Sequence, residues 1–290
     1  MNKKRVVILF VVMIATLFTA CAKNKEKAAV KENSGIKVEV QSTESDGNKE
    51  LEEICRLVNS IIADTNDKRM AAEISISMDD IEEFMADLDK VQKSEKTFSS
   101  DDLSPFFLID KKHNVADNYV PEGLIPLVSN NLYQINKNNL SLRPEAYQAL
   151  NVLAEAAKKD GVTLTVSSTY RSYEYQKNLF DYWVSVDGLE EAERESARPG
   201  TSQHQLGMAL DFAPVDDAFD QTAAGAWVYK NAAKYGWSLS FPKNYEDVTG
   251  YRWECWHFRY IGKEACDFQR KWFNDVQQYM LEFLDTWNTL

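Results

Sequence analysis

Two short stretches of the chain combine residue types that can bind a metal ion and move protons. The first, SQHQLGMALD at 202–211, contains a histidine and an aspartate, and the second, WECWH at 253–257, contains a histidine and a glutamate. Neutral imidazoles and a carboxylate form the ligand set of a catalytic zinc, with an open position left for water. A further carboxylate beside the ligands can take a proton from that water. The pattern therefore predicts a hydrolytic zinc site.

The spacing within these stretches decides how the residues can meet. His204 and Asp211 lie too far apart to share a helical turn, but a loop that enters a strand can bring them together, and Gly207 suits a tight turn there. His257 would complete the ligand set from a neighbouring strand. The alternative is two unrelated polar histidines in a fold without a metal. The chain has only 3 histidines, and two of them fall where a site needs them, which favours the metal site.

The two motifs, in their spacing and their order, resemble those of the zinc D-Ala-D-Ala carboxypeptidases of the VanY type. That family also includes L,D-carboxypeptidases and D-Ala-D-Ala dipeptidases, and the resemblance runs from about residue 117 to the C-terminus. It implies that His204, Asp211 and His257 bind Zn2+. It also implies that Glu254 is the general base, which takes a proton from water and later delivers it to the leaving amine.

The position of Glu254 carries a geometric condition. Residues three apart on a regular strand point to opposite faces of a sheet. Glu254 must therefore lie at a bulge, or on the loop before the strand that carries His257. A surface glutamate without a catalytic role is the alternative. Cys255, between the two, stands where relatives often have proline.

A third segment adds a cation to the expected site. Residues 170–176 read YRSYEYQ and resemble the family's YRSxxxQ segment. The resemblance implies that Arg171 stabilises the developing oxyanion or holds a substrate carboxylate, with Gln176 as a hydrogen-bonding partner in substrate binding. It also implies a substrate contact for Ser202. A surface salt bridge for Arg171 and a turn role for Ser202 are the alternatives, and Trp256 could line the groove or belong to the core.

The predicted fold class is α+β, because the second half of the chain mixes strands that suit antiparallel pairing with flanking helices. The resemblance implies the same, with a small, mainly antiparallel sheet flanked by helices. Strands are expected at 162–167, 207–213, 237–241 and 251–260. Helices are expected at 142–159, 173–186, 190–198, 223–235 and, as one long amphipathic element, at 264–287.

The rest of the chain is expected to divide into a tether at 22–48, a helical appendage with a linker at 49–104, and the zinc peptidase domain at 105–290. The tether is polar and holds too few apolar residues to offset the entropy of ordering. Apolar residues at helical spacing predict helices at 49–64 and 78–91, the second with Ser77 and Asp80 as a possible capping box.

The N-terminus is typical of an export signal. A basic start precedes an apolar run at 6–20, which is shorter than the roughly 20 residues that a spanning helix needs. Cys21 follows small residues and resembles the lipidated cysteine of a bacterial lipobox. We therefore expect residues 1–21 to be a signal peptide and the protein to be an exported bacterial lipoprotein, anchored to the membrane by Cys21 and facing the cell wall. Secretion without a lipid is the alternative.

The charge of the chain and the spacing of its cysteines argue against nucleic-acid binding and against a cysteine zinc site, but they do not determine how the cysteines pair. The formal net charge of -12 argues against nucleic acid as a main partner, because phosphate binding needs clustered Lys and Arg. No pair among the 4 cysteines has the CxxC spacing of a cysteine zinc site. With Cys21 lipidated, Cys55, Cys255 and Cys266 remain, and a bridge between the last two is possible but not determined by sequence.

The function expected first is a zinc metallopeptidase that hydrolyses the C-terminal D-alanine from peptidoglycan stem peptides, as a D,D-carboxypeptidase. Three alternatives stay open: an L,D-carboxypeptidase acting on tetrapeptide stems, a zinc-containing wall-binding module without catalysis, and a wall-anchoring lipoprotein in which the N-terminal helices do the work. A cytosolic D-Ala-D-Ala dipeptidase is disfavoured by the export signal. Glu254 argues for the enzyme, because a non-catalytic module needs no general base.

Overall fold

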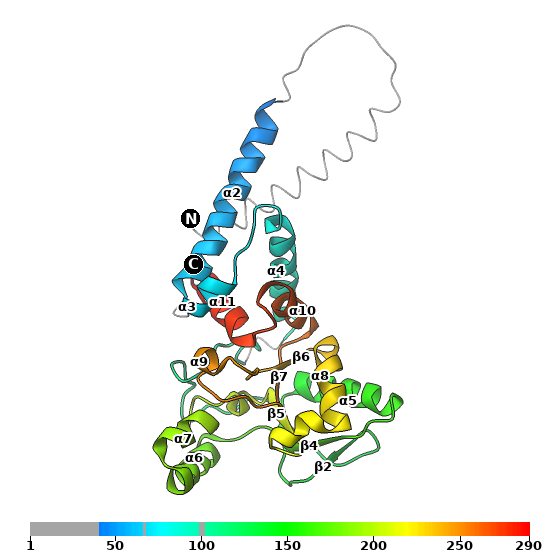
Figure 1. Ribbon diagram of the computed structural model, residues 1–290. Helices are drawn as coiled ribbons and strands as arrows, with labels where there is room; N and C mark the ends of the chain where they lie inside the picture. Colours follow the sequence, from blue (N-terminus) through cyan, green and yellow to red (C-terminus); the bar gives the residue numbers. More distant parts are fainter. Residues whose placement is uncertain (1–40, 66–67, 99–101) are drawn as a thin grey trace. The chain divides into compact units, whose positions relative to one another are not determined.

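The structure is a computed structural model that describes residues 41–65, 68–98 and 102–290, with side chains from residue 47 onward (Figure 1). The predicted signal peptide and Cys21 lie outside these residues, as does most of the predicted tether. The described chain forms two compact units. One holds the described residues up to Ala86 together with Thr286–Leu290, and the other is Asp87–Asp285.

The boundary between the units falls earlier than the predicted one at residues 104 and 105. The reason lies in the second half of helix α4 (Ile81–Glu95), whose Asp87 belongs to the second unit. Its carboxylate accepts hydrogen bonds from Nζ of Lys271 at 2.8 Å and from the indole nitrogen of Trp272 at 3.2 Å. Residues 87–95 of the predicted helical appendage therefore belong to the second unit.

The first unit is helical, as predicted. Helix α2 spans Gln41–Asp64 and the short α3 spans Lys68–Glu73. Four apolar residues of the helix predicted from residue 49 are buried, namely Ile54, Val58, Ile61 and Ile62. Helix α2 nevertheless begins at Gln41, so the tether prediction does not hold for 41–48, where polar residues extend the helix by two turns.

The first hydrogen bond of the predicted capping box is present before α4. The hydroxyl of Ser77 accepts a hydrogen bond from the backbone N–H of Asp80 at 3.2 Å, and it donates to the Asp80 carboxylate at 2.5 Å. The first turn of α4 follows directly. The side chain of Ser77 thus satisfies a donor that would otherwise be left unpaired at the start of the helix.

The second unit is built on a five-stranded sheet with the order β2-β4-β5-β7-β6. Strands β2 and β4 are parallel, and the other three pairings are antiparallel, which confirms the predicted α+β class with a small, mainly antiparallel sheet. The strands are β2 (Tyr133–Ile135), β4 (Leu164–Ser168), β5 (Ala209–Phe212), β7 (His257–Tyr260) and β6 (Trp237–Leu239). A separate pair joins β1 (Ile125–Pro126) to β3 (Ser141–Leu142).

Helices flank this sheet (Figure 1). The helices predicted at 142–159, 173–186, 190–198 and 223–235 match observed helices to within a few residues. The observed helices are α5 (Pro144–Lys159), α6 (Tyr173–Asp187), α7 (Leu189–Glu195), α8 (Ala223–Asn231), α9 (Glu246–Thr249), α10 (Lys263–Trp272) and α11 (Gln277–Thr289), with three 3-10 segments at η2 (Gln203–Leu206), η3 (Asp217–Gln221) and η4 (Ala232–Tyr235). Among the described helices, none is both long and apolar enough to cross a membrane.

The alternation of side chains in β5 and β7 separates the core from the site. Leu210 and Phe258 are register partners and belong to the hydrophobic core, to which α5 contributes Leu150 and α8 contributes Val228. The next pair along the two strands points to the opposite face, because successive strand residues alternate. The core therefore fixes which residues the other face presents.

Two expected elements differ from the structure. The predicted helix at 264–287 is interrupted between α10 and α11, where Asn274 and Asp275 adopt left-handed backbone with φ of 52° and 60°. Asn and Asp tolerate this conformation better than most residues, and Gln269 stabilises it by donating to the backbone oxygen of Asp275 at 3.0 Å. The predicted strand at 251–260 is present only as β7.

Candidate metal centre

The three predicted ligands converge on one point of the sheet. Asp211 in β5 and His257 at the start of β7 are direct register partners. His204 lies on η2, and Gly207 then turns the chain into β5 with a φ of 67°. A side chain at Gly207 would meet Arg143 at 3.2 Å, so both the backbone conformation and the space favour glycine there.

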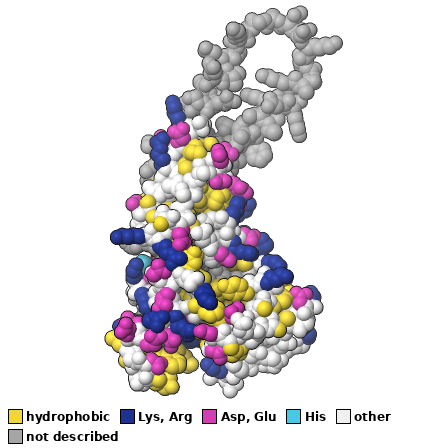
Figure 2. All heavy atoms as spheres, viewed as in Figure 1, with side chains coloured by type: hydrophobic (Ala, Val, Ile, Leu, Met, Phe, Trp, Pro, Cys, Tyr) yellow, Lys and Arg dark blue, Asp and Glu magenta, His cyan; other side chains and the backbone are white. Residues whose placement is uncertain are grey.

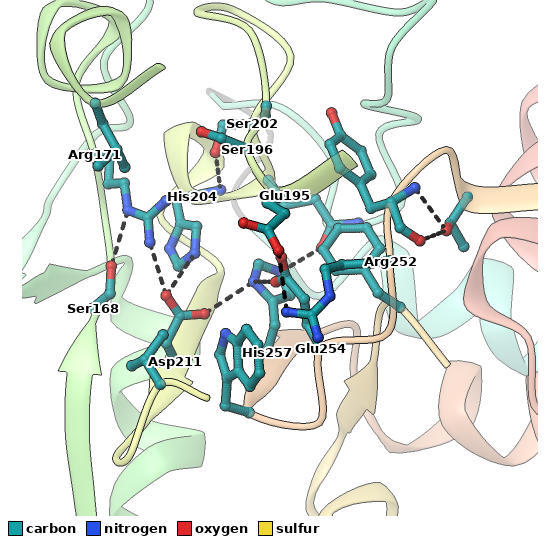
Figure 3. Close-up of a pocket in the computed structure, with 18 of the residues that line it drawn as sticks. Ser168, Arg171, Glu195, Ser196, Ser202, His204, Asp211, Arg252, Glu254 and His257 are labelled. Atoms are coloured by element: carbon teal, nitrogen blue, oxygen red, sulfur yellow. Dashed lines mark hydrogen bonds and ion pairs between the residues drawn. The ribbon is translucent and has the colours of Figure 1, made fainter. Parts of the chain in front are cut away.

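The ligand atoms are close enough to share one ion. Nε2 of His204 lies 3.3 Å from Oδ2 of Asp211, and Nδ1 of His257 lies 3.0 Å from Oδ1 of the same carboxylate. The ligand atoms of the three side chains all lie within 4.8 Å of one another. All three residues are at most 3% exposed. Figure 3 shows both imidazoles turned toward Asp211.

The second nitrogen of each imidazole decides which nitrogen can bind a metal. Nδ1 of His204 lies 2.7 Å from the backbone oxygen of Thr169, and Nε2 of His257 lies 3.1 Å from Oε1 of Gln203. Both partners are acceptors, so the ring protons belong on these nitrogens, and the lone pairs face Asp211. The donor set thus fits zinc, with two oriented imidazoles and a carboxylate.

Electrostatics keep the ligands in the protonation states that a metal needs. Burial lowers the pKa of His204 to about 4, helped by the charge of Arg171, so this imidazole is neutral at pH 7. Burial alone would raise the pKa of Asp211, but His204, His257 and Arg171 hold it well below its usual range. A neutral imidazole and an ionised carboxylate bind metal without first losing a proton.

Arg171 lies beside the ligands, as predicted, and is held in place on three sides. Its Nη2 donates to Oδ2 of Asp211 at 2.8 Å, and its Nε donates to Oγ of Ser168 at 3.0 Å. Its Nη1 donates to Oε1 of Gln176 at 3.3 Å. Its side chain is partly exposed to the cavity, so the guanidinium can still meet a substrate.

Gln176 and Ser202 support neighbouring groups. Gln176 is fully buried and does not border the cavity; its amide donates to the backbone oxygen of Ala197 at 2.8 Å while its oxygen holds Arg171. The hydroxyl of Ser202 accepts from the backbone N–H of His204 at 3.3 Å and caps η2. Ser202 therefore has the turn role that was the alternative to a substrate contact, and it also borders the cavity.

Glu254 satisfies the geometric condition set by the sequence. It lies on the loop before β7, and its Oε2 is 3.7 Å from Nδ1 of His257, the nitrogen that faces the metal position. Burial, followed by the nearby charge of Asp211, raises the pKa of Glu254 well above 4.5. A carboxylate with a raised pKa accepts a proton readily near neutral pH, which suits a general base.

A cavity of about 680 Å³ opens over these residues. Trp256 borders it, whereas Tyr260 packs against Trp237 with ring centroids 5.5 Å apart. His113 lies away from the ligands, with Nδ1 2.8 Å from the Asp110 carboxylate. The three cysteines within the described residues are buried free thiols, so the possible Cys255–Cys266 bridge is not formed.

Sequence reasoning missed the amides that orient His257. Gln203 lies inside the first motif, directly before His204, and an amide next to a metal-binding histidine is a signal for such a role. Gln203 also accepts from the hydroxyl of Ser240 at 2.7 Å and donates to Oε1 of Gln277 at 3.4 Å. Gln277 lies on α11, far from both motifs, and nothing in its local sequence points to the site.

Comparison with known proteins gives consistent matches to one family. The family model described as VanY, D-alanyl-D-alanine carboxypeptidase, matches residues 139–263. "Putative carboxypeptidase YodJ" of Bacillus subtilis is 40% identical over 164 residues, which are 54% of this chain and 60% of that protein. The bifunctional D-Ala-D-Ala dipeptidase and D-Ala-D-Ala carboxypeptidase VanXYC of Enterococcus gallinarum is 30% identical, over 53% of this chain and 82% of that protein.

A solved structure extends the likeness to three dimensions. The LdcB LD-carboxypeptidase superposes with a TM-score of 0.55 at 37% identity, covering 63% of this chain and 87% of that one. The chain spans 60% and 51% of the length of the first two curated relatives that it matches. The sequence identity, the family model and the fold agree, and the chain belongs to the VanY family of D-alanyl-D-alanine carboxypeptidases.

Proposed function

We propose that this protein is a zinc-dependent carboxypeptidase that removes the C-terminal D-alanine from peptidoglycan stem peptides. One observation carries the proposal: two imidazoles and a carboxylate converge within 4.8 Å, beside a buried glutamate and an arginine. The ligand set alone would suit a structural metal, but a structural site does not need a buried glutamate beside the ligands, where Glu254 lies 3.7 Å from Nδ1 of His257. The non-catalytic binding module is therefore disfavoured.

His204, Asp211 and His257 would hold the zinc. When bound, this ion supplies a Lewis acid that polarises a peptide carbonyl and acidifies water. Glu254 takes the proton from the attacking water as its oxygen bonds to the carbonyl carbon. When the C–N bond breaks, Glu254 returns that proton to the departing amine, so it ends each turnover as it began.

Arg171 is placed to act on negative charge. Its guanidinium lies within 2.8 Å of Asp211 and reaches the cavity, so it can steady the oxyanion or hold the terminal carboxylate of the substrate. Gln176 positions Arg171 from behind. Ser202 keeps the start of η2 in place and, from the cavity wall, is available to contact the peptide.

A specific observation favours a second candidate, an L,D-carboxypeptidase that acts on tetrapeptide stems. The LdcB LD-carboxypeptidase is similar to this chain at 37% identity, whereas the family model describes D-alanyl-D-alanine carboxypeptidases. The two activities differ in the residue before the scissile bond. They can share the ligands, the base and the arginine, so the choice depends on the shape of the cavity.

We also propose that the protein is exported and held at the membrane by a lipid on Cys21. The basic start, the apolar run and the following cysteine of the sequence support this. A stem peptide substrate would require the same location. Metabolic labelling with a fatty acid would test it: label should enter the full chain and be lost in Cys21→Ala, and label retained in that variant would refute lipidation at Cys21.

The activity is tested with the zinc-loaded full chain and two muropeptides, one ending in D-Ala-D-Ala and one ending in a single D-Ala. Mass spectrometry reads the products, with Glu254→Gln as the control. Loss of one alanine from the pentapeptide supports the first candidate, and loss from the tetrapeptide alone supports the second. No loss from either, with zinc still bound, would refute a carboxypeptidase.

A further inference from the structure

Helix α6 presents an apolar face that is not buried. The buried residues of this helix are Gln176 and Phe180. Five other apolar side chains, here called the α6 stripe, lie at the surface or only partly covered: Tyr175, Leu179, Tyr182, Trp183 and Val186. Tyr175, Tyr182 and Val186 are each at least 54% exposed. Figure 2 shows hydrophobic side chains at the molecular surface over α6 and α7, among charged ones.

The α6 stripe continues the wall of the catalytic cavity. Tyr175, Leu179 and Trp183 follow one another at intervals of four residues, which places them on one line of the helix, and all three border the cavity that holds the metal ligands. Tyr182 and Trp183 contact each other edge to face, with ring centroids 5.2 Å apart. The apolar face thus leads outward from Arg171, which immediately precedes the helix and its Ser172 cap.

The charge on α6 argues against a membrane as the partner of this face. The helix carries three acidic residues and one lysine, Lys177, which is paired with Asp181 at 2.7 Å. Attraction to an anionic lipid surface needs clustered Lys and Arg. The aromatic rings of the stripe and its tyrosine hydroxyls suit an uncharged partner with both apolar and hydroxyl groups better than they suit an anionic membrane.

The length of the α6 stripe matches the length of the part of a stem peptide that precedes the scissile bond. A helix rises about 1.5 Å per residue, so Tyr175 and Trp183 are about 12 Å apart along the axis. Four extended residues upstream of the scissile bond span about 13 Å. If the proposed function holds, the sugar that carries the peptide would then lie near the far end of α6.

We propose that the α6 stripe, with Tyr182, Trp183 and Val186 at its outer end, is a docking surface for the amino-sugar glycan to which the stem peptide is attached. The C–H faces of a pyranose ring pack on aromatic rings, while its hydroxyl and acetamido groups stay in water. The enzyme would therefore select peptides still joined to the glycan over free peptides. This inference rests on the proposed function.

The test compares two substrates that differ only in the glycan: a disaccharide pentapeptide and the same pentapeptide without sugars. The wild-type full chain should show a KM about tenfold lower for the glycosylated substrate, as expected for one or two aromatic contacts. The double variant Tyr182→Ser/Val186→Ser should lose this preference and hydrolyse the free pentapeptide as the wild type does. Tyr229→Ser, which removes an exposed tyrosine on α8, should keep the preference.

Equal KM values for the two substrates in the wild type, or an unchanged preference in the double variant, would overturn the docking proposal. Hydrolysis of neither substrate would refute the proposed function, and binding would then decide about the stripe. Peptide-free glycan strands should bind the wild type and not the double variant. Absence of binding to the wild type would overturn the docking proposal. If the wild type instead binds anionic phospholipid vesicles and the double variant does not, the α6 stripe is a membrane-binding surface and the docking proposal is wrong.

Discussion

Replacing Gln203 by methionine would test whether the orientation of His257 determines the affinity for zinc. In the structure, Oε1 of Gln203 lies 3.1 Å from Nε2 of His257 and keeps the ring proton there. Methionine has a similar volume but offers no comparable acceptor. The buried N–H would then be unsatisfied, at a cost of about 1–3 kcal/mol, or the proton would move to Nδ1, the nitrogen needed for the metal. Either outcome should weaken zinc binding about 10- to 100-fold, or about 1.4–2.7 kcal/mol.

The assay is a zinc titration of the metal-free full chain in competition with a chelator of known affinity, without substrate. Gln203→Glu keeps an acceptor and should retain most of the affinity. Gln205→Met is the matched control, because Gln205 is fully buried on the same 3-10 segment but contacts backbone oxygens and not a histidine. An affinity of Gln203→Met equal to that of the wild type would refute the reasoning.

Three further substitutions test the electrostatics and the backbone. In the metal-free protein the pKa of Glu254 is raised, so its stabilising contribution is complete below pH 4.5 and is lost as the pH rises through the folded-state pKa. Glu254→Gln should therefore increase the free energy of unfolding at neutral pH, with little change below pH 4.5, in urea denaturation; a decrease at neutral pH would contradict this. Gly236→Ala should cost about 3 kcal/mol or more by the same measurement, since φ is 81° and a Cβ would lie 2.9 Å from backbone atoms of Gly262. Gly161→Ala, with φ of 77° and open space, should cost about 1–2 kcal/mol, and equal losses would show that the close approach is unimportant.

The convergence of His204, Asp211 and His257 could be predicted from the sequence, because two of them lie on neighbouring strands and His204 lies on the turn that leads into one of these strands. Asp211 alternates with Leu210 in β5, and His257 alternates with Phe258 in β7, so one hydrophobic pattern fixes both the core and the site. The requirement that Glu254 lie outside the strand followed from the same alternation and was confirmed. Helices α5, α6, α7 and α8 were also predicted from the sequence, whereas α9 was not and α10 and α11 were expected as one helix.

What the sequence did not predict depends on contacts between distant segments. Gln277 reaches Gln203 across 74 residues, and no pattern in α11 distinguishes it from an ordinary buried amide. The break at Asn274 and Asp275 was missed because neither residue forbids a helix; tertiary contacts such as those of Gln269 decide the backbone there. Gln176 was expected at the substrate, whereas its burial behind Arg171 depends on the packing of α6 against the segment that carries Ala197.

The most direct test of the account is to measure zinc content and D-alanine release together in the wild type and in Glu254→Gln. The account predicts about one zinc per chain in both proteins, because Glu254 is not a ligand. It also predicts that release falls at least about 100-fold in the variant, since the proton acceptor is lost. Release by Glu254→Gln at the wild-type rate, or by a wild-type chain stripped of zinc, would contradict it.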